Sequence, residues 1–355
     1  MFIIDAHLDL AMNAMEWNRD LRKSVLELRQ LEKGMTDKPD RTHGTVSLPA
    51  LRQGNIGLVV ATQIARVETA GTGIKGWQTA AQAWAHTQGQ LAWYQAMEAE
   101  GEMVQIKNKQ ALEAHLLLWN NGLPNEKKPI GFILSLEGAD SLVNIDYLHT
   151  AYNYGLRAVG PAHYGPGRYA HGTNATSKLN EMGKALIKEM DSLNMILDVT
   201  HLCDEAFWEA IEIFNGTIWA SHHNCRSLVN HNRQLSDDMI KALIQKKAVI
   251  GAAFDAWMIV PNWERGVSTP TNTNCNLEKI INHIDHICQI AGNTNHIGIG
   301  SDLDGAFGKE QCPSDIETIS DIQKLPTLLL KRGYSEQDCQ KIMHGNWLAV
   351  FQNAL

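Results

Sequence analysis

Eight short apolar runs alternate with longer amphipathic stretches along the chain, and this alternation constrains the fold more than any other feature. The runs cover residues 2–9, 56–64, 130–137, 158–163, 195–201, 217–222, 248–254 and 296–302. Helix-like segments lie at 78–98, 179–193, 204–214, 236–245, 276–291 and 316–332. Short buried strands that alternate with amphipathic helices form a parallel sheet covered by crossover helices. Because eight such strands close a barrel, the pattern predicts an α/β fold of the (β/α)8 TIM-like type.

The domain organisation follows from the length of the chain and from its lack of internal boundaries. The chain has 355 residues, with no internal repeat and no Ser/Pro/Gly-rich linker. Barrels of this class commonly exceed about 250 residues as one unit, so we expect a single barrel domain over residues 1–355. Residues 19–42 are dense in charge and follow the first run. They indicate a partly helical excursion above the barrel mouth, with a solvated surface arm as the alternative.

Charge, apolar runs and cysteine content limit which partners, location and kinds of metal site or cross-link the chain can have. The 31 Lys and Arg against 39 Asp and Glu give a net charge of −8, so no basic excess supports nucleic-acid binding. The chain has no run of about eighteen apolar residues and no signal-peptide pattern at its start, so we expect no membrane partner and a cytoplasmic location. The six cysteines form no C-x-x-C pair, which disfavours a thiolate zinc site and a disulfide framework.

Histidine and carboxylate residues gather where the predicted strands end. A parallel barrel directs the carboxyl ends of its strands towards one cavity, which is where such folds carry their chemistry. Six of the eight predicted strand ends carry His, Asp or Glu, in a chain with 15 His residues. Because buried charges need a partner or a metal, such a set is hard to explain as packing. The donors at these ends are His7, Asp9, Glu137, His163, His201, His222 and Asp302.

The spacing of these donors favours a metal centre with two ions. Side chains alternate along a strand, so His7 and Asp9 face the same side and can chelate one cation. His201 and His222 would hold a second cation, and Glu137 would place one oxygen on each. Imidazole and carboxylate without thiolate suit zinc or another borderline divalent ion. Two such ions, about 3.5–4 Å apart, share a water, lower its pKa and polarise a carbonyl, which predicts a hydrolase.

On these residues the chain resembles the membrane (renal) dipeptidase family, binuclear zinc peptidases of the amidohydrolase-like type. The resemblance runs from Asp5 to the G-N-W segment that ends at Trp347, which is almost the whole chain. In that family an H-x-D on the first strand is followed by a bridging Glu before Gly and by two His ligands on later strands. The residues that match in order and context are His7, Asp9, Glu137, His201 and His222.

The resemblance implies a metal-dependent dipeptidase that cleaves small dipeptides with a hydroxide bridging two zinc ions. His163, in a P-A-H-Y segment, matches a His that contacts the substrate and stabilises the oxyanion. Arg233, eleven residues after His222, matches an Arg that binds the free carboxylate of the substrate. Asp302, in an S-D-L-D-G segment, matches the acid that moves a proton from the attacking water to the leaving amine. The family also makes a homodimer an expectation.

Two departures from the family pattern bear on the site and on the substrate. His223 stands where the family's S-H-S-N pattern has Ser, and the alignment selects His222 as the ligand. The segment that begins at Phe254 and Asp255 does not match the Tyr-containing turn of the renal enzyme. An amidohydrolase or deacylase with the same metal centre but a different amide substrate is therefore an alternative function. A non-catalytic metal-binding barrel is less favoured, because the ligand set is intact.

Overall fold

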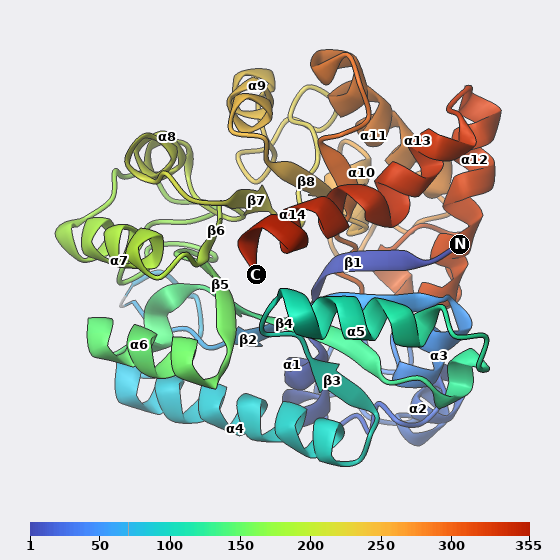
Figure 1. Ribbon diagram of the computed structural model, residues 1–355, viewed down its shortest axis with the longest axis horizontal. Helices are drawn as coiled ribbons and strands as arrows, with labels where there is room; N and C mark the ends of the chain where they lie inside the picture. The colour runs from blue at the N-terminus through green and yellow to red at the C-terminus, as the bar shows by residue number, and fades with distance from the viewer. Residues whose placement is uncertain (70) are drawn as a thin grey trace.

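A parallel sheet forms the centre of the protein, whose computed structural model describes residues 1–69 and 71–355. Its strands run in the order β2-β1-β9-β8-β7-β6-β5-β4-β3, and a further pairing of β2 with β4 closes eight of them into a barrel. This closure confirms the predicted (β/α)8 TIM-like fold (Figure 1). The strands are β1 Ile3–Leu8, β2 Ile56–Ile64, β3 Met103–Gln105, β4 Ile130–Glu137, β5 Leu156–Gly160, β6 Ile196–Asp198, β7 Ile218–Ala220, β8 Val249–Ala252 and β9 Ile297–Ile299.

Helices surround the ring of strands, as Figure 1 shows. None of the helices in the described ranges has the length and apolar content needed to cross a membrane. Their bounds are α1 Leu10–Glu16, α2 Val25–Leu31, α3 Leu48–Gln53, α4 Ala80–Ala99, α5 Lys109–Trp119, α6 Ile145–Tyr154, α7 Glu181–Ser192, α8 Asp204–Ile213, α9 Asp237–Gln245, α10 Ala256–Ile259, α11 Leu277–Ala291, α12 Leu325–Arg332, α13 Glu336–Gln340 and α14 Asn346–Ala354.

Strand β3 is a ninth strand that the sequence pattern did not predict. It pairs with Ile130–Phe132 at the start of β4, whereas β5 pairs with Leu134–Glu137 at its end. Three residues are too few for an alternation to be visible in the sequence. Other helices also lie outside the predicted segments, namely α1, α3, α5, α6, α10, α13 and α14. Several strands are shorter than predicted, so the later candidate residues stand in the loops just after them.

An apolar cluster fills the barrel beneath the site and is completed by the last helix. Inward-facing residues such as Ile4, Val60 and Trp219 form this cluster together with Trp347 and Phe351 of α14. Helix α14 lies across the middle of the ring of strands in Figure 1. The amide of Asn346, at its start, donates to the carbonyl of Thr294, which precedes β9. Helix α14 therefore closes the amino-terminal end of the barrel and leaves the carboxyl end open.

A register shift in β1 aims the first candidate ligand into the barrel mouth. Ile4 and Ala6 belong to the interior cluster, so strict alternation would turn His7 outward. The pairing of β1 with β2 is irregular between Asp5 and Leu8. An irregularity of this kind, a β-bulge, re-aims the side chains that follow it. His7 consequently faces the donor cluster at the carboxyl ends of the strands.

The charged segment 19–42 packs onto the barrel mouth. It contains α2, and its residues Arg19, Glu32 and Asp40 are buried. The Arg19 guanidinium donates to Glu32 Oε1 over 2.8 Å and to Asp40 Oδ2 over 3.0 Å, and it lies 3.6 Å from Asp304 Oδ2. Because Asp304 belongs to the loop after β9, these contacts tie the segment to the loop that carries Asp302.

Candidate metal centre and active site

Glu137, the last residue of β4, lies among three imidazoles at the barrel mouth. Its Oε1 is 3.2 Å from Nε2 of His201, 3.5 Å from Nε2 of His222 and 3.6 Å from Nε2 of His7. The same nitrogen of His7 is 3.9 Å from Oδ1 of Asp9. The fold thus brings together all five residues predicted as ligands, from strand ends far apart in the sequence.

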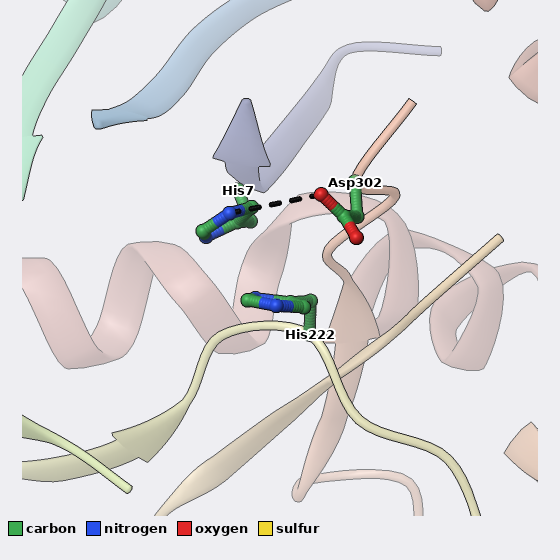
Figure 2. Close-up of side chains that lie close together, drawn as sticks. All are labelled: His7, His222 and Asp302. Carbon is green, nitrogen blue, oxygen red and sulfur yellow. Dashed lines mark ion pairs between the residues drawn. The ribbon is translucent and has the colours of Figure 1, made fainter. Parts of the chain in front are cut away.

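The donor atoms form three overlapping groups, each with its atoms within 4.8 Å of one another. One group is His7, Asp9 and Glu137, and another is Glu137, His201 and His222. These two share Glu137, as the predicted two-ion centre requires. The third group joins His7, His222 and Asp302, drawn in Figure 2, where the dashed line spans 3.8 Å from His7 Nε2 to Asp302 Oδ1.

Hydroxyl groups contact the Nδ1 atoms of two of the candidate ligands, His201 and His222. Thr173 Oγ1 lies 3.0 Å from Nδ1 of His201, and Ser221 Oγ lies 2.9 Å from Nδ1 of His222. A partner on one ring nitrogen fixes the ring and directs the other nitrogen at the metal. Nε2 of His7 is buried and has no hydrogen-bond partner in the described part of the chain. The donor set therefore fits divalent metal ions.

These orienting residues were not found from the sequence. Thr173 is 28 residues before His201, in the loop between β5 and α7, and nothing in the local sequence marks it. Ser221 is adjacent to His222 and lies within the quoted motif, so its position was the available signal. The hydroxyl of Thr62, inside β2, binds Oδ1 of Asp9, and a Thr within an apolar strand is too common to be diagnostic.

Of the two neighbouring histidines after β7, His222 joins the cluster. Its Nε2 is 3.2 Å from Nε2 of His201. His223 is buried, with its backbone N–H donating to the carbonyl of Gly251 over 2.7 Å, and it belongs to none of the donor groups found in residues 1–69 and 71–355. The geometry agrees with the alignment that selected His222.

Burial and mutual charge set the ionisation of the cluster. Burial holds the pKa of His201 and His222 well below the usual value, which leaves their lone pairs free at neutral pH. Burial would also lower the pKa of His7, but Glu137 together with Asp9 and Asp302 outweighs it and raises that pKa to about 10. Burial would raise the pKa of Glu137, but the surrounding imidazoles, His7 foremost, outweigh it and hold that pKa well below its usual range. Glu137 is therefore an anionic donor.

A cavity of about 340 Å³ opens beside the cluster and is lined by Arg233, His163 and Asp302. Arg233 is 2% exposed, and its Nη2 donates to the carbonyl of His222 over 2.9 Å. Its Nε and Nη1 have no partner within the described residues. His163 Nε2 lies 3.8 Å from Glu137 Oε1. The three residues that the resemblance assigned to substrate and proton transfer thus share one cavity with the candidate ligands.

The family model for the membrane dipeptidases, peptidase family M19, matches residues 1–355. An uncharacterized protein in the pqqA 5′ region of Klebsiella pneumoniae is 27% identical over 237 residues, which is 64% of this chain and 83% of that protein. Dipeptidase tcpJ of Claviceps purpurea is 27% identical over 235 residues, 62% of this chain and about half (51%) of that protein.

Solved structures share the fold along the whole chain. A crystal structure of the M19 metallopeptidase dipeptidase AC gives a TM-score of 0.79 at 20% identity, covering 100% of this chain and 98% of that one. A metallopeptidase from Rhodobacter sphaeroides gives 0.79 at 19% identity, covering 100% and 99%. The family predicted from the strand-end residues is confirmed. The chain belongs to the membrane dipeptidase family, peptidase family M19, and is a metallo-dipeptidase, a hydrolase of peptide bonds.

Proposed function

We propose that this protein hydrolyses small dipeptides with two divalent ions, preferably zinc, held by the donor cluster. The observation that carries the proposal is the pair of donor groups that share Glu137. His7 and Asp9 would hold one ion, His201 and His222 the other, and Glu137 both. When bound, two such ions lower the pKa of a water shared between them and polarise the scissile carbonyl. A related metallopeptidase is described with a phosphinate mimic of L-Ala-D-Ala, which supports a dipeptide substrate.

Arg233 binds the free carboxylate of the dipeptide in this proposal. Its guanidinium is buried, is anchored by one bond to the carbonyl of His222 and keeps two further donor nitrogens unpaired in the described structure. A planar guanidinium pairs with a carboxylate through two parallel hydrogen bonds. This contact fixes the carboxyl end of the substrate and excludes chains extended beyond that end.

His163 stabilises the charge that develops on the carbonyl oxygen. Burial lowers the pKa of His163 to about 3, with Glu137 opposing and Arg66 and Arg233 adding to the effect. The ring is therefore neutral at pH 7 and keeps one N–H to donate. A buried donor aimed at a developing oxyanion acts without the cost of reorganising water.

Asp302 transfers the proton. Burial raises the pKa of its carboxyl well above the usual range, and Asp9 and Glu137 add to this rise while His7 opposes it. A carboxylate with a raised pKa takes a proton from the attacking water at Oδ1 or Oδ2 and returns it to the leaving amine nitrogen.

Metal analysis combined with a substrate panel tests the proposal. The purified protein is expected to bind about two equivalents of Zn²⁺ and to cleave L,L or L,D dipeptides only when metal is present. N-acyl amino acids, which lack the free amine, serve as the comparison for a deacylase. Fewer than two equivalents together with no metal-dependent dipeptide cleavage would contradict the proposal.

A further inference from the structure

Arg66 is a cationic side chain of the active-site cavity that is not among the candidate metal ligands and has no substrate contact in the proposed mechanism. It lies two residues after β2, is partly buried, and lines the cavity together with His163 and Arg233. Within residues 1–69 and 71–355 its guanidinium makes no ion pair or hydrogen bond that meets ordinary distance limits. A guanidinium held in a substrate cavity without a partner is available to bind an anionic group.

Asp140 lines a small hollow together with Arg66, but both of its carboxylate oxygens already accept backbone hydrogen bonds. Asp140 accepts the backbone N–H of Arg168 over 2.7 Å and that of Val67 over 3.1 Å, with one oxygen each. Arg265 is the third arginine that lines the cavity. Unlike Arg66, it has a carboxylate nearby, because its Nη2 lies 3.9 Å from Oδ2 of Asp255. Arg66 is therefore the cavity arginine, besides Arg233, that is free to take a ligand carboxylate.

The barrel places Arg66 opposite the predicted carboxylate site. Arg233 is anchored to the carbonyl of His222, just after β7. Around the closed barrel, β7 is reached from β2 through β4, β5 and β6, which is four of eight steps. Arg66 and Arg233 are therefore carried by opposite sides of the barrel, and both line the cavity that Glu137 also lines. A dipeptide that has its carboxyl end on Arg233 and its peptide bond at the cluster extends its amino-terminal residue towards the wall of Arg66.

An apolar floor adjoins Arg66 on that wall. Met12 and Ile64 pack together beside it and also line the cavity. A smaller hollow of about 130 Å³ continues past these residues and is lined by Arg66, the exposed Lys75 and Glu16, whose Oε1 lies 2.9 Å from Nε2 of His86. Methylene groups pack on the floor, and a carboxylate at their end meets the cations. The wall thus matches a short aliphatic stem that ends in a negative charge.

We propose that Arg66 selects dipeptides whose amino-terminal residue has an acidic side chain, with glutamyl dipeptides preferred. This inference rests on the proposed dipeptidase function, because it takes the substrate's carboxyl end to be on Arg233. The two methylenes of glutamate lie on Met12 and Ile64, and the side-chain carboxylate pairs with the guanidinium of Arg66. A lysyl side chain at the same place meets two like charges, Arg66 and Lys75, and is disfavoured.

Matched substrates and variants test the inference. The zinc-loaded protein is assayed on Glu-Ala, Gln-Ala, Ala-Ala and Lys-Ala, which share one carboxyl-terminal residue. The kcat/KM for Glu-Ala is expected to exceed that for Gln-Ala about 10- to 100-fold, the range of a charge-assisted hydrogen bond. In Arg66→Met, which keeps the aliphatic stem, this ratio falls to about 1. Arg265→Met removes a positive charge elsewhere in the cavity and is expected to keep the ratio.

The outcomes separate this inference from the proposed function. Cleavage of Ala-Ala with equal rates for Glu-Ala and Gln-Ala, or a glutamyl preference that survives in Arg66→Met, overturns the inference and leaves the dipeptidase intact. If the protein cleaves none of the four dipeptides, the proposed function fails and calorimetric binding of Glu-Ala and Gln-Ala decides the inference. Tighter binding of Glu-Ala that is lost in Arg66→Met then supports the anionic subsite, and equal binding overturns it.

Discussion

The candidate catalytic acid lies in a loop of unusual backbone conformation. Asp302, Asp304 and Ala306 have φ values of 58°, 62° and 63°, in the left-handed region that non-glycine residues rarely adopt. His201 shares this conformation, with φ 68°. Such residues persist only where surrounding contacts hold them, and they concentrate at functional sites. Here the backbone N–H of Asp302 donates to the carbonyl of His7 over 3.2 Å, which couples the acid to the first ligand candidate.

Asp302→Asn is expected to retain about two equivalents of metal while kcat falls about 10²- to 10⁴-fold, because the amide cannot take up the proton. His201→Ala, in contrast, is expected to lose metal as well as activity. Metal content by mass spectrometry and kcat on the best dipeptide check both variants. Wild-type kcat in Asp302→Asn would refute the assignment of this residue.

Thr173 orients His201 through its hydroxyl, so removing that hydroxyl is expected to weaken metal binding. Thr173→Val keeps the shape of the side chain, and the affinity for Zn²⁺ is expected to fall about 10- to 100-fold. Titration against a fluorescent zinc chelator measures the change. Thr150→Val, at an exposed position of α6 where the hydroxyl contacts only its own helix, is the control. An unchanged affinity in Thr173→Val would show that the contact does not orient the ring.

At the scale of elements, buried hydrogen bonds and ion pairs hold the segment 19–42 against the mouth of the barrel. Glu32 Oε1 accepts hydrogen bonds from Arg19 and Arg41, both over 2.8 Å, and Oε2 accepts the N–H of Thr42 over 2.7 Å. The carboxylate of Asp304 accepts the backbone N–H groups of the residues at 45 and 46. Removing one partner from a buried network is costly, because it leaves the other charges uncompensated.

Glu32→Gln is expected to lower the free energy of unfolding at pH 7 by about 3–5 kcal/mol. Burial would raise the pKa of Glu32, but the bonds from Arg19 and Thr42 outweigh it and lower that pKa below the unfolded value of 4.5. Its contribution is therefore complete above pH 4.5 and is lost as the pH falls through the folded pKa.

Urea unfolding at pH 7 and at acid pH checks this expectation, since the difference between Glu32→Gln and the parent protein should shrink in acid. Asp20→Asn, which removes an exposed partner of Arg22, is the control and should cost less than about 1 kcal/mol. A difference that grows as the pH falls would reverse the sign assigned to Glu32.

At the scale of the whole molecule, one end of the barrel is closed by packed side chains and the other carries the candidate active site. Trp347 stacks on Phe351, meets the edge of Trp219 and donates from Nε1 to the carbonyl of Ile299 over 2.9 Å. These contacts join the last helix to the first and last strands through one interior cluster. The stability of the barrel thus depends on residues at the end opposite to the metal centre.

Trp347→Ala is expected to lower the free energy of unfolding by about 3–5 kcal/mol, because it leaves a cavity and removes a buried hydrogen bond. The fraction that remains folded should keep its zinc and its KM. Trp208→Ala, at a position 42% exposed, should cost less than about 1 kcal/mol. Urea unfolding and zinc content of the folded fraction are the measurements. A loss of zinc without a loss of stability would contradict the assignment of stability to one end of the barrel and of metal binding to the other.

Candidate residues could be sought at the ends of predicted strands because a buried strand leaves a hydrophobic pattern that is visible in a short stretch of sequence. Runs such as 56–64 and 130–137 coincide with β2 and β4, since both faces of these strands are buried and the runs are mostly apolar. Strand β3 has three residues and left no such trace. Arg66 also stands just beyond a predicted strand end, and the search for His, Asp and Glu passed over it because arginine was not among the types sought.

The sequence by itself determined the eight-strand barrel, the family and the set of donors at the strand ends, because each depends on periodicity or on short motifs along the chain. Only the tertiary structure decided that a bulge turns His7 into the mouth, that the hydroxyl of Thr173 lies beside His201 and that Arg66 and Arg233 line one cavity. These features are contacts between residues far apart in the sequence. Their geometry follows from strand register and loop packing, which no local pattern encodes.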